Sequence, residues 1–242
     1  MMKDIERYCD ELVEWMRFKV LDAKGRGVVF GLSGGIDSAV VAGISKLAFP
    51  ETALGVIIPC NSNPIDEEDA LLVAERLDLK TRTVDLSETY NVLTKELQIQ
   101  DGSSMAASNI KPRLRMTTLY YLAQSNGYLV LGCSNKSEFT VGYFTKHGDT
   151  GADLLPIASI VKRDIWKMAE YLNIPREVID KVPTAGLVED QTDEEDMGFS
   201  YDVLDTYILE GAGPEGDVAK IKRMHDISEH KRRFPPIFTS KY

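Results

Sequence analysis

A short run of small and polar residues, Ser33–Ser38, constrains this chain more than any other feature of its sequence. An apolar run, Val28–Leu32, comes directly before it, and a second apolar run, Ala39–Ile44, directly follows it. β-branched and aromatic residues favour a strand, paired glycines favour a tight turn, and the second run has a helical pattern. The sequence therefore predicts a strand, a turn and a helix in succession.

The composition of this turn, Ser-Gly-Gly-Ile-Asp-Ser, is typical of a loop that binds phosphate. Gly34 and Gly35 carry no Cβ, so backbone N–H groups can approach an anion where the helix begins and where its dipole favours negative charge. Ser33 and Ser38 add hydroxyl donors, and Asp37 adds a carboxylate suited to a hard cation such as Mg²⁺. An ordinary strand-to-helix turn is the alternative. The turn lacks the Gly-Lys-Ser/Thr ending of a Walker A loop, so another class of nucleotide loop is expected.

Strands and helices are expected to alternate along the chain. Besides the strand at 28–32, apolar or β-branched runs predict strands at residues 53–59, 81–86 and 128–132, and helical spacing predicts helices at 3–24, 66–78, 87–97 with Ser87 as cap, 109–124 and 162–172. This alternation predicts an α/β fold, a doubly wound parallel sheet of about five strands with helices on both faces. Ligands of such sheets bind at the carboxyl ends of the strands. Gly31–Ser38, Pro59–Asn63 and Cys133–Glu138 should therefore share one edge.

Composition excludes several classes of protein. Of the 242 residues, 43% are hydrophobic and 27% are charged, which is ordinary for a globular domain. A net charge of −10 argues against a general nucleic-acid binder. Cys9, Cys60 and Cys133 have neither the spacing of a zinc site nor that of a disulfide framework. The first residues are charged, and no apolar run reaches membrane-spanning length, so we expect one cytoplasmic domain over residues 1–242, with no membrane or nucleic-acid partner.

Further polar clusters follow the strand expected at 128–132. Glu138 is a candidate metal carboxylate beside Asp37, although the helix dipole also favours a glutamate at the start of a helix. Segment 142–153 places glycines, a lysine and two aspartates around aromatic residues, which suits a polar ligand as well as a surface turn. Segment 109–116 begins a helix with three cations, which the dipole disfavours, so an anionic partner is inferred.

The acidic stretch at residues 188–196 interrupts this regular pattern. It is consistent with a solvated loop followed by a helix that starts at Thr192. A mobile lid over a nearby site is an equal alternative. The sequence does not separate the two.

The turn at Ser33–Ser38 resembles the pyrophosphate loop of the N-type ATP pyrophosphatases, which cleave ATP to AMP and pyrophosphate. All the motifs together closely resemble the ammonia-dependent NAD synthetases, over about residues 27–236. The matching motifs are Gly-Leu-Ser-Gly-Gly-Ile-Asp-Ser at 31–38, Pro-Arg-Leu-Arg-Met at 112–116, Asn-Lys-Ser-Glu at 135–138, Gly-Tyr-Phe-Thr-Lys-His-Gly-Asp at 142–149, Pro-Thr-Ala-Gly-Leu at 183–187 and His-Lys-Arg-Arg at 230–233. The resemblance implies a Rossmann-like fold of the adenine nucleotide alpha-hydrolase-like type.

The resemblance implies a role for each matching residue. ATP binding is implied for Gly31, Leu32, Ser33, Gly34, Gly35, Ile36, Asp37, Ser38, Cys133, Lys162 and Thr184, and Mg²⁺ binding for Asp37 and Glu138. Deamido-NAD binding is implied for Arg113, Lys146, Asp153, His230 and Lys231, and catalysis for Asp37, Lys162 and Asp149, the last near the nicotinate and ammonia. Without the resemblance, Lys162 would be a surface lysine and His230 part of a basic tail. Cys133 and Gly186 depart from relatives that have Thr and Asp there, so any role of Cys133 falls to its backbone.

The resemblance also implies the reaction and the partners. The nicotinate carboxylate of deamido-NAD attacks the α-phosphorus of ATP, giving an adenylate and pyrophosphate, and ammonia then displaces AMP to form NAD⁺. The chain has no length for a glutaminase domain, so ammonia is expected either free or from a partner protein. A homodimer is implied as well.

Three alternatives stay open at this point. Two are enzymes with the same type of loop, one GMP synthetase-like and one tRNA thiolase-like, and the lack of a CxxC motif counts against the thiolase. The third is a nucleotide-binding module without catalysis. Asp37 and Glu138 count against that module, because a passive binder needs no metal carboxylates.

Overall fold

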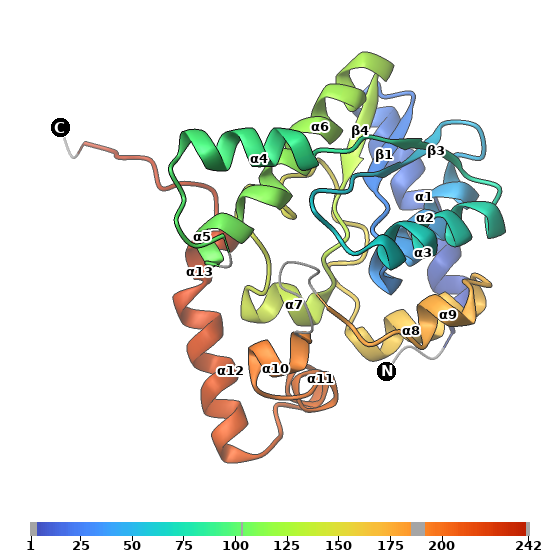
Figure 1. Ribbon diagram of the computed structural model, residues 1–242. Helices are drawn as coiled ribbons and strands as arrows, with labels where there is room; N and C mark the ends of the chain where they lie inside the picture. The colour runs from blue at the N-terminus through green and yellow to red at the C-terminus, as the bar shows by residue number, and fades with distance from the viewer. Residues whose placement is uncertain (1–3, 103, 185–191, 241–242) are drawn as a thin grey trace.

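The computed structural model describes residues 4–240 except residue 103 and residues 185–191. Within these residues, four parallel strands form one sheet in the order β3-β2-β1-β4 (Figure 1). The strands are β1 (Gly27–Gly31), β2 (Ala53–Ile57), β3 (Lys80–Thr83) and β4 (Tyr128–Leu131). An isolated parallel bridge between Leu131 and Leu154 continues the sheet beyond β4. The expected doubly wound parallel sheet is confirmed, with four strands and this bridge in place of about five strands.

Helices surround the sheet and form most of the remaining structure. In the described part of the chain they are α1 (Ile5–Asp22), α2 (Ile36–Ala48), α3 (Pro64–Arg76), α4 (Ser87–Glu96), α5 (Met105–Ser108), α6 (Ile110–Asn126), α7 (Lys136–Val141), α8 (Lys162–Tyr171), α9 (Arg176–Ile179), α10 (Asp193–Met197), α11 (Tyr201–Glu210), α12 (Glu215–Ile227) and α13 (Glu229–Arg232). None of these helices is both long enough and apolar enough to cross a membrane.

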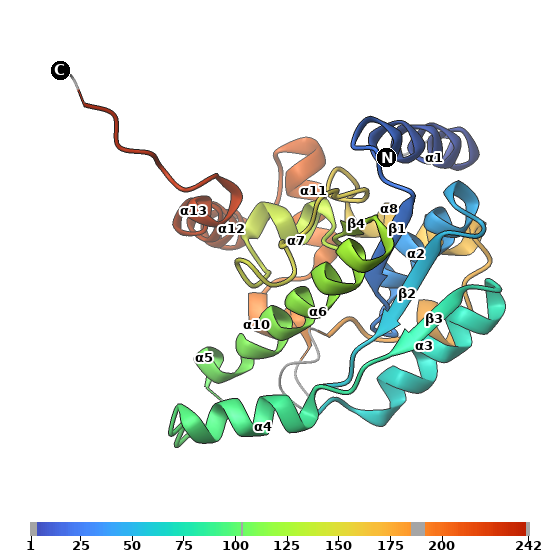
Figure 2. The same cartoon turned by 90° about the horizontal axis from the view of Figure 1, so that it is seen from above.

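Alternating side chains of the strands fill two cores, one on each face of the sheet (Figure 2). Val28 and Phe30 of β1 pack with α1, α2 and α8, whereas Val29 packs with α4 and α6. This alternation follows from the period of two in a strand, and it explains why β1 reads as a continuous apolar run. The apolar face of α1 is buried on its own chain, with Met16 0% exposed.

A third, smaller core lies apart from the sheet, under α7, α10, α11 and α12 (Figure 1). Its buried members are Val141, Met197, Phe199, Tyr201, Leu204 and Ile221. Helix α11 contacts both α7 and α8, so this core is joined to the main body of the protein through those two helices.

The order of the strands locates the binding site. From β1 the chain moves to β2 and β3 on one side, and it then returns to place β4 on the other side of β1. In doubly wound sheets, the crevice at such a reversal is where ligands bind. The loops that leave β1 and β4, residues 31–36 and 132–135, therefore flank this crevice.

Two details of the expected helices need comment. Ser87 does not cap α4, because the helix begins at Ser87 with Leu86 as its N-cap, and Ser87 Oγ accepts from the backbone N–H of Asn61 at 3.0 Å. The start predicted at Thr192 is confirmed, since Thr192 is the N-cap of α10 and forms a reciprocal capping box with Glu195. Residues 188–191 of the acidic stretch lie outside the described residues.

The burial of α1 generates a stability prediction. Met16→Ala should lower the free energy of unfolding by about 2–5 kcal/mol, because it removes a fully buried side chain and leaves a cavity. Phe18→Ala is the matched control on the same helix, since Phe18 is 61% exposed and its loss should change stability by less than about 0.5 kcal/mol. Urea unfolding of both variants measures the difference. Equal losses would contradict the assignment of the buried face.

Candidate active site

A cavity of about 520 Å³ opens at the carboxyl ends of the strands, where β1 and β4 part. Many of the residues predicted for the site line it. These are Gly31, Leu32, Ser33, Gly35, Ile36, Asp37, Ser38, Cys133, Glu138, Asp149, Lys162, Thr184 and Lys231. Gly34, Arg113, Lys146, Asp153 and His230 are not among the lining residues. The structure thus brings segments 31–38, 59–63 and 133–138 to one edge of the sheet, as expected, and segment 142–151 joins them there.

The loop between β1 and α2 is held in shape by its own serines. Ser38 Oγ donates to the carbonyl of Gly35 at 2.8 Å and accepts from the backbone N–H of Ser33 at 3.2 Å. Gly35 is the N-cap of α2 and provides no side-chain acceptor for the first turn. Amides at the start of a helix that no side chain satisfies are available to an anionic ligand.

Gly34 is required by both conformation and space. Its φ of +79° lies in the left-handed region, and a Cβ built there would stand 2.3 Å from the carbonyl oxygen of Asp66 in α3. The loop therefore packs directly on the backbone at the start of α3. A side chain at position 34 would force the two apart.

Lys162 is the central charge of the site. It is 1% exposed, and its Nζ lies 2.5 Å from Asp37 Oδ2 and 3.7 Å from Glu138 Oε1. Burial lowers the pKa of Lys162, but Asp37 and then Glu138 outweigh burial, so the net shift is upward and the ammonium is retained. The alternative of a surface lysine is wrong. The Lys162 ammonium also faces the ring of Tyr201 at 4.9 Å.

Asn135 joins the two carboxylates and was not expected from the sequence. Its Nδ2 donates to Asp37 Oδ1 at 2.9 Å and to Glu138 Oε1 at 2.8 Å. Asn135 and Glu138 also form a capping box at the start of α7. The helix-start interpretation of Glu138 is confirmed, and Glu138 also lies beside Asp37, where its role as a metal carboxylate stays a prediction. An Asn three residues before a Glu was the signal in the sequence.

The Asp37–Glu138 pair offers the donor atoms that Mg²⁺ prefers. Burial, and next the charge of Asp37, raise the pKa of Glu138, which shows that a nearby cation would be favourable here. Within the described ranges, no group of three or more His, Cys, Asp or Glu is arranged to hold a metal ion. One or two carboxylates are nevertheless the usual protein ligands of Mg²⁺. Water molecules and phosphate oxygens of the substrate complete its coordination.

Several predicted cationic residues gather beside the cavity. Arg113 Nε donates to the carbonyl of Lys146 at 3.3 Å, and Lys146 Nζ lies 3.4 Å from His230 Nδ1. These residues come from α6, the 142–151 loop and α13, and their chain neighbours Pro112, Thr145 and Lys231 line the cavity. We call Arg113, Lys146 and His230 the rim cluster. The positive charges of Arg113 and Lys146 favour an anion there.

Asp153 and Lys231 both have structural partners in the protein. Asp153 accepts from the backbone N–H of Val130 at 2.8 Å and from the Tyr120 hydroxyl at 3.1 Å. Lys231 Nζ donates to two carbonyls of the 142–151 loop, those of Gly142 and Phe144, at 2.8 and 2.9 Å. Lys231 thus holds the 142–151 loop, whereas Asp153 ties the chain just after that loop to β4 and α6.

Asp149 and Arg115 are charged residues that line the cavity. Asp149 Oδ2 accepts from the backbone N–H of Thr145 at 2.7 Å, and burial raises the pKa of its carboxyl group. Arg115 lines the cavity, where its Nε donates to the carbonyl of Ile58 and its Nη2 to the hydroxyl of Ser62, both at 3.0 Å. Sequence reasoning missed Arg115, although it is the second arginine of the Pro-Arg-Leu-Arg-Met motif.

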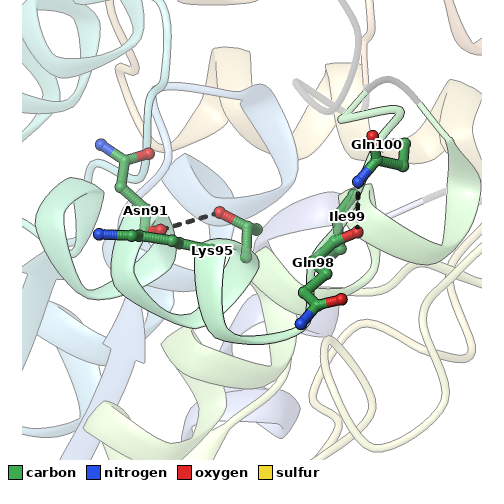
Figure 3. A pocket seen from close by; sticks show the side chains of 6 residues that line it. Asn91, Lys95, Gln98, Ile99 and Gln100 are labelled. Atoms are coloured by element: carbon green, nitrogen blue, oxygen red, sulfur yellow. Dashed lines mark hydrogen bonds between the residues drawn. The ribbon is translucent and has the colours of Figure 1, made fainter.

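A second hollow, at the end of α4, is not a comparable site (Figure 3). Asn91, Thr94, Lys95, Gln98, Ile99 and Gln100 line it. The two hydrogen bonds drawn there are internal, from Thr94 Oγ1 to the carbonyl of Asn91 and from Gln100 Nε2 to the carbonyl of Gln98. It offers one lysine and no carboxylate, whereas the cavity at the strand ends combines a helix start, buried charges and predicted residues.

The sequence profile of the NAD synthase family matches residues 8–235. The chain belongs to the NAD synthase family. An NH(3)-dependent NAD(+) synthetase of Carboxydothermus hydrogenoformans is 49% identical over 235 residues, which cover 96% of this chain and 97% of that protein. The resemblance inferred from the combined motifs is thereby confirmed.

Solved structures agree with this membership in the NAD synthase family. An NMN synthetase from Francisella tularensis has a TM-score of 0.93 and 32% identity, with 100% of both chains covered. An NH3-dependent NAD synthetase from Campylobacter jejuni has a TM-score of 0.82 and 29% identity, with 98% of this chain and 100% of the other covered. The fold and the family are therefore shown by independent comparisons.

The packing of the loop generates a second prediction. Gly34→Ala should reduce activity at least about 10-fold, because the new Cβ would displace the loop from α3 and disturb the start of α2. Gly216→Ala in α12 is the matched control, since a Cβ there meets nothing within 4 Å. Steady-state turnover and the binding of ATP measure the effect. Normal ATP binding by Gly34→Ala would show that the loop does not need this conformation.

Proposed function

We propose that this chain is an ammonia-dependent NAD synthetase, a ligase that forms an amide C–N bond. It adenylates the nicotinate carboxylate of deamido-NAD with ATP and then replaces AMP by ammonia, giving NAD⁺, AMP and pyrophosphate. The observation that carries the proposal is the buried Lys162 between Asp37 and Glu138, directly beside the Gly-Gly loop at the switch point of the sheet. Membership in the NAD synthase family supports the reaction.

The phosphates of ATP are assigned to the β1–α2 loop. The start of α2 supplies backbone donors, Ser33 and Ser38 line the same wall, and Lys162 supplies a fixed cation 2.5 Å from Asp37. Asp37 and Glu138 would hold Mg²⁺, which when bound neutralises charge on the triphosphate. Lys162 stays protonated and near its carboxylates, so it can stabilise the charge that develops on pyrophosphate. Thr184, Cys133 and Gly31 complete the lining on the ATP side.

The nicotinate substrate is assigned to the opposite part of the cavity. The rim cluster supplies cations for its phosphates, and Lys231 holds the loop that carries Lys146. Asp153 contributes by anchoring β4 beside this loop, since its carboxylate already accepts two hydrogen bonds there. Asp149 is the cavity-lining carboxylate that we assign to the neighbourhood of the nicotinate and ammonia.

Ammonia is used directly in this proposal. The relatives named NH(3)-dependent NAD(+) synthetase are nearly of the same length, and the alignment with the Carboxydothermus protein covers 97% of it. We accordingly treat residues 1–242 as one synthetase domain.

A homodimer is part of the proposal, and the C-terminal segment supports it. Figures 1 and 2 show this segment extending away from the body of the protein after α13. Phe234, Ile237 and Phe238 on it are 83%, 76% and 91% exposed. Exposed apolar side chains on an extended arm are favourable when a second copy covers them.

A second candidate function has a specific observation in its favour. The structural neighbour with a TM-score of 0.93 is an NMN synthetase, so amidation of the nicotinate mononucleotide is the alternative. Both substrates share the nicotinate, the ribose and one phosphate, and they differ in the adenosine phosphate half. The experiment below separates the two.

The assay that tests the function supplies ATP, Mg²⁺ and ammonium with either the dinucleotide or the mononucleotide of nicotinate. We expect NAD⁺, AMP and pyrophosphate, with kcat/KM for the dinucleotide at least about 10-fold above that for the mononucleotide. Chromatography of the products measures both outcomes. Formation of ADP in place of AMP would contradict the assignment of the loop. A higher kcat/KM for the mononucleotide would instead support amidation of the nicotinate mononucleotide as the function.

The rim cluster generates a separate kinetic prediction. Arg113→Ala should raise the KM for the nicotinate dinucleotide by about 10-fold or more and change the KM for ATP much less, because one cation of the cluster is lost. Arg7→Ala is the control, since Arg7 pairs with Glu11 on the exposed face of α1. Initial rates with each substrate varied in turn give both constants. An equal rise in the two KM values would count against the assignment.

A further inference from the structure

A buried carboxylate on α11, Asp205, lies behind the site rather than in it. It is 0% exposed and does not line the cavity. Both of its oxygens accept hydrogen bonds, Oδ1 from the Ser137 hydroxyl at 2.5 Å and Oδ2 from the backbone N–H of Arg163 at 2.7 Å. Asp205 therefore cannot contact a substrate, but it holds two other parts of the chain.

Each partner of Asp205 stands next in sequence to a residue of the proposed site. Ser137 comes directly before Glu138 at the start of α7, and Arg163 comes directly after Lys162 at the start of α8. A third hydrogen bond closes the link, because the backbone N–H of Lys162 donates to Ser137 Oγ at 3.0 Å. The first turns of α7 and α8 are thus tied to each other and to α11.

The start of α8 depends on these acceptors. Its N-cap residue, Val161, has no side chain that can accept from the first turn. Ser137 and Asp205 accept from the N–H groups of Lys162 and Arg163 in its place. A carboxylate near the N-terminus of a helix also interacts favourably with the helix dipole. Removing the acceptors would leave buried donors unsatisfied, so the turn that carries Lys162 would shift to find other partners.

We propose that Asp205 is a positioning residue that fixes Lys162 relative to Glu138 for the release of pyrophosphate. The proposal rests on the proposed function of the site. Asp205 acts through Ser137 and through the first turn of α8, and it lies on α11, the helix that supplies Tyr201 and Leu204 to the small third core. A displacement of about 1 Å in a catalytic group can cost about 100-fold in rate, so a residue without substrate contact can still control turnover.

The first test replaces Asp205 by asparagine, which keeps the shape but turns one accepting oxygen into a donor. We expect Asp205→Asn to lower kcat at least about 10-fold, or about 1.4 kcal/mol in activation free energy. The concentration of Mg²⁺ needed for half-maximal rate should rise, because Glu138 is displaced together with Ser137. The KM for the nicotinate substrate should stay within about 2-fold, because the rim cluster does not contact Asp205.

Asp202→Asn is the matched control. Asp202 lies on the same helix and pairs with the side chain of Arg163 at 2.9 Å, but its own side chain is 87% exposed. Its loss removes an ion pair with the same arginine and leaves the backbone N–H of Arg163 bonded to Asp205. We expect kcat and the Mg²⁺ requirement of Asp202→Asn to be those of the wild type.

A double-mutant cycle with Ser137→Ala tests the route. Because Ser137 and Asp205 share one hydrogen bond, the double variant should lose no more than about 2-fold beyond Asp205→Asn alone. Should Asp205→Asn be unfolded at the assay temperature, as circular dichroism would show, Ser137→Ala carries the test, since it removes one hydroxyl. The proposal would be overturned if the losses in kcat of the two single variants multiplied in the double variant. It would also be overturned if both single variants had the kcat of the wild type.

Failure of the proposed function would look different. In that case the wild-type protein would not form NAD⁺ and AMP from the nicotinate dinucleotide, ATP and ammonia. Failure of the positioning role would instead leave an active wild type with variants as fast as it. A fall in kcat that matches the fraction of unfolded protein at each temperature would also reject the positioning role.

Discussion

The contact between Lys162 and Asp37 joins parts of the chain that are 125 residues apart in sequence. A lysine that is 1% exposed loses most of its hydration, and this loss is compensated only when opposite charges and hydrogen bonds replace the water. Asp37, Glu138 and the ring of Tyr201 provide that environment. They come from the starts of α2 and α7 and from α11, so the charge can be buried only when all three helices are in place.

This requirement explains why the small third core belongs with the sheet. Tyr201 and Asp205 of α11 are 2% and 0% exposed, and both face the charged site, one through its ring and the other through Ser137. Helix α11 therefore serves two purposes, since its apolar residues fill the third core and its polar residues complete the environment of Lys162. Loss of α11 would expose Lys162 to solvent or remove the groups of α11 that stabilise its buried charge. The stability of the site and the stability of the third core are thus coupled.

Much of the fold could be predicted from the sequence because it depends on local patterns. Period-two and helical spacing located β1, β2, β4, α1 and α6 to within a few residues, and Gly-Gly after a strand located the loop. The helices α11 and α12 were not expected, because their apolar residues pack in a small core away from the sheet, against α7 and α8 as well as each other, and the surrounding segments are acidic. Ser87 was assigned as a cap on residue type alone, whereas it is the first residue of α4 and its hydroxyl accepts from Asn61 on a distant loop.

The site could be predicted only in part, because its contacts are not local in sequence. A motif identifies a residue type, but burial and contacts depend on segments distant in sequence. Asn135 and Arg115 lie inside motifs that were recognised, yet nothing local shows that Asn135 bridges two carboxylates or that Arg115 faces the cavity. Asp205 belongs to no recognised motif, and its role follows from three hydrogen bonds between separate helices.

The distribution of charge bears on which substrate the site takes. The chain has a net charge of −10, yet Arg113, Lys146 and His230 gather at one rim, beside the cavity and not among its lining residues. The charges of Arg113 and Lys146 favour an anion at this rim, and the phosphates of ATP are already assigned to the β1–α2 loop. A ligand that fills the cavity and also extends to the rim would supply that anion. The second phosphate of a dinucleotide reaches further from the nicotinate than the single phosphate of a mononucleotide, so the rim cluster favours the dinucleotide.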